Sequence, residues 1–226
     1  MKISFNKNQS DDLWIPVSDM MSGLMMIFLL IAIIYILSFT EQADEIKQTQ
    51  ERICSDIIDE FRDKQEAWNM TVCEDGLLVS FENDSVFDSG KSTLKDEFKE
   101  ILDTFFPKFM AIIVKNKKDI QELRIEGHTS SEFASPTKEV AYVNNTNLSQ
   151  ARAFSVMKYV FKLLSNKDKL DWMTKNLTAH GMSSSKLKLN ELDLEDKEKS
   201  RRVEFRIQTN VQDKLIEQLR SSSISP

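Results

Sequence analysis

The sequence predicts an α/β (α+β) protein with a single N-terminal transmembrane helix, a helical linker, and a domain whose mixed β-sheet is packed by helices. Three observations support this fold. An apolar run near the N-terminus is long enough to span a membrane, and a charged stretch without glycine or proline follows it. After that, short segments in which apolar and polar residues alternate are interspersed with segments whose apolar residues recur at helical spacing. The expected segments are a short cytoplasmic tail at 1–13, the transmembrane helix at 14–39, a helical linker or dimerisation segment at 40–69, the domain at 70–210 and a C-terminal tail at 211–226.

The apolar run extends from Val17 to Leu37, and its 21 residues would form about 31 Å of helix, the thickness of a bilayer's hydrocarbon core. A cleaved signal peptide would have a shorter apolar core and a small-residue cleavage site, and no such site precedes Glu41. A buried helix of a soluble protein would need other equally apolar segments around it, which the chain lacks. We therefore expect a retained membrane anchor.

Asp19 lies near the start of this run, where a carboxylate is unfavourable by several kcal/mol unless it is paired, hydrated or protonated. Trp14 suits the membrane interface and Pro16 suits the first turn of a helix, so Ser18 or Asp19 could act as the N-cap. Two interpretations of Asp19 stay open. It is either a structural cap or a carboxyl group that alternates between charged and neutral forms as its access to water changes.

The segment from Trp14 to Leu29 (WIPVSDMMSGLMMIFL) resembles the start of the MotB-like stator subunits, in which a Trp, an Asp and a Met-rich helix follow in this order. The resemblance implies that Asp19 is the proton-carrying carboxylate of an ion-conducting unit. It also implies that a homodimer of this chain lies inside a pentamer of a MotA/ZorA-like membrane protein. Ser22, Gly23 and the methionines would allow the close, adaptable helix packing that such a pore requires.

The basic residues near the span predict its orientation. Lys2 and Lys7 precede it, whereas Lys47, the first lysine after it, follows three acidic residues. The N-terminus is therefore expected in the cytoplasm. The family resemblance agrees, and implies a bacterial inner-membrane protein whose C-terminal domain is periplasmic.

Residues 41–68 contain neither glycine nor proline, and apolar residues within them form one narrow helical seam. The seam consists of Ile46, Ile53, Ile57, Phe61 and Trp68. It would pack either on a second copy of the chain or on the domain that follows. Flagellar members of the resembled family carry a plug and a proline-bearing linker at this point. Neither is recognisable here, which favours the ZorB branch of the family, found in Zorya anti-phage defence.

Composition argues against several function classes. The chain has a net charge of −6 and no evident basic face, which disfavours a nucleic-acid partner. Cys54 and Cys73 are 19 residues apart, which suits neither a zinc site nor a CxxC redox pair; in an oxidising compartment they are candidates for one disulfide. With two histidines, no nucleophile–base set and no glycine-rich phosphate loop, we expect no enzyme activity, no cofactor and no metal.

The domain is expected to begin with a β-hairpin in which Thr71–Cys73 and Leu77–Phe81 flank an Asp-Gly turn. Residues 94–114 carry an apolar helical stripe that Pro107 should kink or split. Further expected elements are a short strand at 123–126, a helix from Ser149 to about Leu164, a loop or mobile insertion at 183–200, a strand around Val203–Ile207 and a short helix at 211–220.

Several motifs make residues 77–208 similar to the OmpA-like peptidoglycan-binding domains. They are the FDSG step at Phe87–Gly90, Gly127-His128-Thr129-Ser130, the NxxLSxxRA element at Asn145–Ala153, Ala179-His180-Gly181 and the SRRVE segment at Ser200–Glu204. The resemblance implies a cell-wall anchor that binds peptidoglycan. The residues it assigns to this binding are Thr129, Ser130, Asn145, Leu148 and Arg152.

These residue types suit a ligand with both a carboxylate and an amine, such as the diaminopimelate of peptidoglycan stem peptides. Arg152 can bind the carboxylate with two hydrogen bonds, and Ser149 is expected to cap a helix whose free N–H groups favour an anion. In the resembled family an aspartate after Gly-His-Thr receives the amine, and this chain has Ser130 there. Either Glu132 takes its place, or binding is weaker, or the ligand differs. One of the two arginines that open the last strand is also placed to reach the ligand.

Two function classes follow. In the first, the chain is a proton-conducting stator subunit anchored to the cell wall, in anti-phage defence by preference and in flagellar motility as the alternative. In the second, it is a purely structural wall anchor and Asp19 is only a helix cap. An Asp19→Asn substitution separates the two, because a tether should tolerate it.

Overall fold

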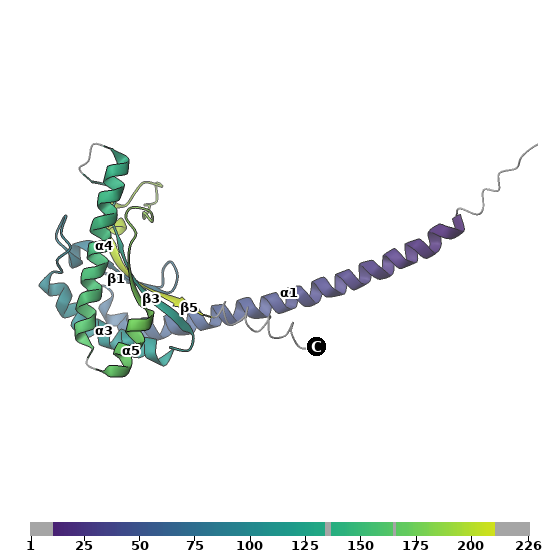
Figure 1. The fold of residues 1–226 in the computed structure, drawn as a ribbon, viewed down its shortest axis with the longest axis horizontal. Helices are drawn as coiled ribbons and strands as arrows, with labels where there is room; N and C mark the ends of the chain where they lie inside the picture. Colours follow the sequence, from purple (N-terminus) through teal and green to yellow (C-terminus); the bar gives the residue numbers. More distant parts are fainter. Residues whose placement is uncertain (1–10, 134–136, 165, 211–226) are drawn as a thin grey trace, which may run out of the picture. The chain divides into compact units, whose positions relative to one another are not determined.

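The computed structural model describes residues 11–133, 137–164 and 166–210 of the chain (Figure 1). They fall into two compact units, one ending at Lys47 and the other beginning at Gln48. Most of the predicted N-terminal tail and the short helix expected at 211–220 lie outside the described residues.

The first unit is the part of α1 (Asp11–Phe61) that precedes Gln48. Its segment Pro16–Thr40, 25 residues long, is the one helical segment in the described part of the chain that is long and apolar enough to cross a membrane. The Ser22 hydroxyl donates a hydrogen bond to the Ser18 carbonyl at 2.9 Å. This polar side chain is therefore satisfied by its own helix, as a lipid environment requires.

The start of α1 corrects one interpretation of Asp19. The helix begins at Asp11, earlier than expected, and continues through Pro16, whose missing N–H removes only one hydrogen bond near the helix end. Asp19 therefore lies about two turns inside the helix. It is not the N-cap, and neither is Ser18, so capping does not explain the carboxylate at this position.

The second unit is built on one five-stranded sheet in the order β1-β2-β5-β3-β4. β3 pairs in parallel with β4, and all other neighbours pair antiparallel. This mixed sheet, packed by helices, confirms the predicted fold class. The strands are β1 (Met70–Val72), β2 (Leu78–Glu82), β3 (Ile120–His128), β4 (Leu177–Gly181) and β5 (Arg202–Thr209).

The two long helices of this unit lie along one face of the sheet (Figure 1). α4 and α5 form the crossover between the parallel strands β3 and β4. The helices are η1 (Arg62–Lys64), α2 (Asn83–Val86), α3 (Asp96–Lys115), α4 (Lys138–Leu163), α5 (Lys167–Asn176) and α6 (Lys197–Ser200).

α3, β3 and the region 183–200 also differ from the expectation. α3 is not split at Pro107 but continues through it. β3 begins at Ile120, three residues before the expected start. The region 183–200, expected as a loop or mobile insertion, contains α6 and a β-bridge between Leu189 and Glu195.

Phenylalanines fill the core between the sheet and the helices. Phe105 of α3 stacks on Phe109 with ring centroids 5.0 Å apart, and Phe81 of β2 meets Phe105 edge-on at 5.1 Å. Phe205 of β5 lies 5.4 Å from Phe105. Because side chains alternate along a strand, the neighbours of Phe205 on β5 point to the opposite face of the sheet.

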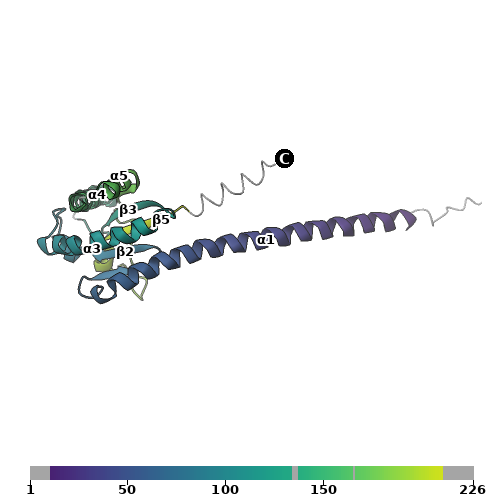
Figure 2. The ribbon, with the colours of Figure 1, turned by 90° about the horizontal axis from the view of Figure 1, so that it is seen from below.

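The last turns of α1, from Gln48 to Phe61, pack beside α3 (Figure 2). Ile53, Ile57 and Phe61 are at most 1% exposed and belong to the core. At these positions the apolar seam packs on the domain, which is one of the two alternatives that the sequence left open. The side chain of Ile46 lies outside those described. Ion pairs border the contact: Arg52–Asp119 at 2.8 Å, Asp56–Lys115 at 2.9 Å and Glu60–Lys108 at 2.7 Å.

A disulfide joins the same helix to the hairpin. Cys54 of α1 and Cys73, which directly follows β1, are bonded, and their Cα atoms lie 6.2 Å apart. This separation falls in the usual range for disulfides. The spacing of the two cysteines in the sequence could not show whether their Cα atoms come close enough for a disulfide.

Candidate functional site

The residues assigned to wall binding line one cleft beside the carboxyl end of β3. Thr129 and Ser130 directly follow this strand, and Asn145, Leu148 and Arg152 come from one face of α4, because they are spaced by three and four residues. The cleft has a volume of about 570 Å³. Its lining consists of Ser89, Gly90, Thr129, Ser130, Glu132, Phe133, Asn145, Leu148, Arg152 and Arg201.

Two glycines let α4 approach the sheet closely enough to form this cleft. A Cβ atom on Gly127 would overlap the Ser149 carbonyl oxygen, and one on Gly181 would lie 2.5 Å from the Gln150 nitrogen. The Gln150 side chain also bonds β4, accepting from the Gly181 N–H at 2.7 Å and donating to the Ala179 carbonyl at 3.2 Å. The Gly-His-Thr and Ala-His-Gly motifs therefore position the helix that carries the binding residues.

The predicted role of Ser149 was wrong. α4 begins at Lys138 and is capped by the Thr137 side chain, so Ser149 lies in the middle of the helix. Its hydroxyl oxygen accepts a hydrogen bond from the Ser183 N–H at 3.0 Å and thus fixes the segment after β4. The helix N-terminus is not at the cleft, and an anion bound there must be held by side chains such as Arg152.

Arg152 is only 2% exposed although it lines the cleft. Its Nε atom donates to the Lys91 carbonyl at 2.9 Å, and its guanidinium carbon lies 5.1 Å from the centroid of the Phe87 ring. The ring face attracts the cation and the hydrogen bond fixes its plane. Arg152 is thus held in one orientation, as recognition of a carboxylate requires.

Hydrogen bonds to backbone carbonyls hold the wall of the cleft opposite α4. The Asn145 amide donates to the Ser130 carbonyl at 3.2 Å, and the Thr129 N–H donates to the Ser183 carbonyl at 2.9 Å. The Thr129 hydroxyl, in contrast, is buried and has no hydrogen-bond partner within the described residues. An unsatisfied buried hydroxyl is unfavourable by about 1–3 kcal/mol, so a polar group of a ligand is its natural partner.

Glu132 is the one acidic residue among those that line the cleft. It forms an ion pair with Lys197 of α6, and hydrogen bonding from Lys197 holds the pKa of Glu132 below its usual value. Of the two arginines that precede or open β5, Arg201 lines the cleft, whereas Arg202 bonds to Glu204 elsewhere. The cleft therefore presents charges of both signs.

The family model that matches the chain is that of the OmpA family, over residues 86–201, just over half of the sequence and all of the cleft. This chain belongs to the OmpA family. The Zorya protein ZorB of Escherichia coli is 34% identical over 215 residues, which cover 91% of this chain and 92% of that protein. A MotB-like protein from Desulfovibrio vulgaris shares the fold, with a TM-score of 0.50 and 17% identity over 75% of this chain and 98% of that one.

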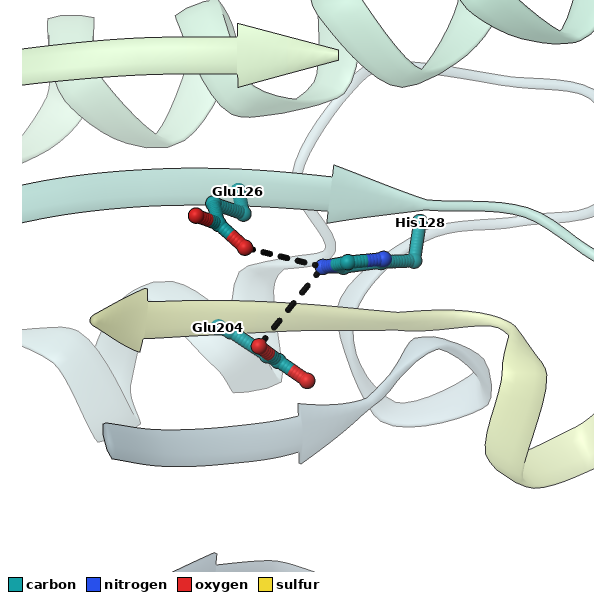
Figure 3. Close-up of side chains that lie close together, drawn as sticks. All are labelled: Glu126, His128 and Glu204. Atoms are coloured by element: carbon teal, nitrogen blue, oxygen red, sulfur yellow. Dashed lines mark ion pairs between the residues drawn. The ribbon is translucent and has the colours of Figure 1, made fainter. Parts of the chain in front are cut away.

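The OmpA domain also contains a buried ionic network on the sheet face away from its core (Figure 3). Glu126 of β3 and Glu204 of β5 are direct cross-strand neighbours, and the His128 Nε2 atom lies 3.4 Å and 3.6 Å from their respective Oε2 atoms. Like charges in direct register repel each other. Arg206 relieves the repulsion by donating to Glu204 at 2.5 Å and to Glu126 at 3.3 Å, and Arg202 donates to Glu204 at 2.6 Å.

Two carboxylates and two arginines balance the charge of this network when the His128 ring carries no extra proton. Burial lowers the pKa of His128, so the ring is neutral at pH 7. Burial opposes ionisation of Glu126 and Glu204, but the charges of the neighbouring arginines outweigh it and hold both pKa values below the usual one. The three side chains are close enough to hold a metal ion. A divalent ion would add two charges to carboxylates that two arginines already neutralise, so we assign the network a structural role.

Sequence motifs account for most, but not all, of the cleft in the OmpA domain. Ser89 and Gly90 belong to the FDSG step, which carried the resemblance without being assigned to the site. Phe133 had no sequence signal, because a lone aromatic in a polar loop fits many environments. Asp19 belongs to the other compact unit and lies outside this cleft.

Proposed function

We propose that this chain is the ion-conducting subunit of a wall-anchored membrane motor, with Asp19 as its proton-carrying group. The observation that carries the proposal is the position of Asp19 about two turns inside an apolar helix, where it caps no helix end. An ionisable residue in such a helix is expected to mark an ion pathway. The similarity to ZorB along 91% of the chain supports a role in anti-phage defence.

The partner is a MotA/ZorA-like membrane protein, arranged as a pentamer around a homodimer of this chain. Asp19 lies at the dry interface between them, where protonation makes its side chain neutral and loss of the proton returns it to contact with water. Alternation between these two forms couples proton flow to rotation of the partner ring. A Cβ atom at Gly23 would meet nothing within 4 Å in this chain, which leaves room for a closely packed neighbouring helix.

The OmpA domain holds the motor to peptidoglycan, because a stator must stay fixed while its partner turns. The ligand of the cleft is a stem peptide whose diaminopimelate carries both a carboxylate and an amine. Arg152 binds the carboxylate, and the buried Thr129 hydroxyl gains a hydrogen-bond partner. Asn145, Leu148 and Ser130 complete the contact.

This role places the chain in the bacterial inner membrane, with its N-terminus in the cytoplasm and the OmpA domain in the periplasm. Lys2 and Lys7 on the N-terminal side support the orientation. The Cys54–Cys73 disulfide supports it as well, since such bonds persist in oxidising compartments and the periplasm is one.

Two alternatives compete with this proposal. A flagellar-type stator would use the same parts to drive swimming. A purely structural wall anchor would need only the cleft, and the cleft is indeed assembled without any contribution from Asp19. The Asp19→Asn substitution distinguishes a motor from an anchor, and the phenotype that it removes distinguishes one motor from the other.

The test is an Asp19→Asn variant co-expressed with the partner ring protein, assayed for phage protection and for swimming. Asparagine keeps the size of the side chain but cannot carry a proton. We expect phage protection to be lost while a pull-down still recovers the complex. Full protection by a correctly assembled Asp19→Asn complex would return the chain to the role of a wall anchor, and loss of swimming alone would indicate a flagellar stator.

A further inference from the structure

Thr129 indicates that the cleft is built for a ligand. Its hydroxyl is buried, lines the cleft and has no hydrogen-bond partner among the described residues. The residue as a whole is 4% exposed, so bulk water does not readily satisfy this hydroxyl. A polar ligand group would do so.

The charges around the cleft restrict the class of ligand. Arg152 is buried and oriented by Lys91 and Phe87, and it presents a fixed positive charge. Glu132 lines the same cleft, and its side chain is 58% exposed. A ligand that satisfies both needs a carboxylate at one end and a positive charge at the other.

Positive charge at Glu132 is already supplied by the protein itself, mainly by Lys197 and to a smaller extent by Arg201, which also lines the cleft. Lys197 of α6 donates a hydrogen bond to Glu132, and both side chains are about half exposed. Such exposed pairs contribute little to stability and exchange readily. The Lys197 ammonium therefore stands where the ammonium group of a ligand would bind.

The loop that carries Glu132 is independently fixed to the segment before α6. The Ser131 N–H donates to Glu195 at 2.8 Å, and the Ser131 hydroxyl donates to the same carboxylate. Breaking the Glu132–Lys197 pair thus leaves the loop attached. The lysine can be displaced while the cleft keeps its shape.

We propose that Glu132 receives the ammonium group of a zwitterionic ligand and that Lys197 is a built-in competitor for it. Binding then requires exchange of one ammonium for another at Glu132, with Arg152 holding the ligand's carboxylate. The inference rests on the proposed wall-binding function and assigns specificity within that site. Removing the acid weakens binding, whereas removing the lysine strengthens it.

The test uses the full-length protein in detergent and two probes: a muropeptide tripeptide with a free diaminopimelate amine, and the same peptide acetylated at that amine. For Glu132→Gln we expect about three- to tenfold weaker binding of the free-amine peptide and no change for the acetylated one. For Lys197→Met we expect about two- to fivefold tighter binding of the free-amine peptide. Matched controls on the same short helix are Glu198→Gln and Lys199→Met, which should change neither affinity.

The outcomes separate this inference from the function on which it rests. The roles of Glu132 and Lys197 would be overturned if Glu132→Gln left both peptide affinities unchanged or lowered them equally. Weaker binding of the free-amine peptide by Lys197→Met would overturn them too, and in each case wall binding would stand. If the unmodified protein bound neither peptide, the proposed wall-binding function itself would fail. Both substitutions lie at exposed side chains, so the variants should fold.

Discussion

At the scale of single residues, the buried side chains of the sheet determine how stability responds to pH. His128 is 1% exposed and lies between two carboxylates that arginines neutralise. Its burial lowers its pKa, so the folded state holds the ring neutral while an unfolded chain would still bind a proton. This difference links protonation to unfolding.

Stability should therefore fall as the pH drops below about 6.5, the ordinary histidine value. In that range the unfolded state takes up a proton before the folded state does, and one proton changes the free energy of unfolding by about 1.4 kcal/mol per pH unit at most. His128→Asn should flatten the slope between pH about 6.5 and about 5 in urea unfolding monitored by tryptophan fluorescence. His180→Gln is the matched control, since that side chain is 44% exposed. An unaltered slope in His128→Asn would contradict the linkage.

Glu126 and Glu204 act in a lower pH range. Their folded pKa values lie below the ordinary value of 4.5, so they contribute stability above that pH and lose it as the pH falls further. The histidine and glutamate contributions can thus be distinguished by the pH at which each disappears.

Sequence motifs indicated which side chains lie together where a motif gave both residue type and spacing. The resemblance of the NxxLSxxRA element to OmpA-like domains assigned Asn145, Leu148 and Arg152 to the site, and all three line the same cleft. Ser149 misled because a serine before a helical stripe resembles a cap, while nothing in residues 138–148 breaks a helix. Arg201 and Arg202 could not be told apart, since the first strand residue was not known.

At the scale of elements, the contact between α1 and the domain is the feature the sequence left open. The apolar seam was compatible with a second copy of the chain or with the domain, because a stripe of isoleucines does not specify its partner. The structure packs Ile53 and Ile57 into the domain core beside α3. α3 itself continues through Pro107 because Phe105, Phe106 and Phe109 around it are fully buried, and this packing outweighs one lost hydrogen bond.

Ile57→Ala should lower the free energy of unfolding by about 2–5 kcal/mol, the usual effect of a cavity at a fully buried position. Glu60→Gln, on the same helix as Ile57, removes the exposed ion pair with Lys108 of α3. It should change the free energy of unfolding by less than about 1 kcal/mol. Urea unfolding in detergent measures both. Light scattering on the same samples measures the oligomeric state. If Ile57→Ala dissociated a dimer and left the free energy of unfolding unchanged, Ile57 would pack on a second copy and the prediction would be wrong.

The disulfide between α1 and the hairpin should stabilise the domain by restricting the unfolded chain. For a loop closed by cysteines 19 residues apart, the loss expected in Cys54→Ser/Cys73→Ser is about 3 kcal/mol. Adding a reductant to the unmodified protein should reproduce this loss, and adding it to the double variant should have no further effect. A reductant that changes the double variant equally would mean that the bond is not the cause.

At the scale of the whole molecule, the chain combines an apolar helix with an embedded carboxylate and an OmpA domain with a ligand cleft. The sequence predicted both parts, because a membrane span and a spaced motif are strong local signals. It did not predict the extent of α1 or the position of Asp19 within it, since helix starts depend on weak capping signals. The proposed function depends on that position. Capping would explain a carboxylate at the helix end, but a carboxylate inside an apolar helix needs another explanation.

The measurement that tests this account most directly is proton flux through the assembled complex. Vesicles containing this chain and its partner ring protein, loaded with a pH-sensitive dye, would be exposed to an inward proton gradient. We predict a flux that Asp19→Asn abolishes and Asp19→Glu partly retains, with equal amounts of complex in each preparation. A flux that persists unchanged in Asp19→Asn would contradict the central claim that Asp19 carries the proton.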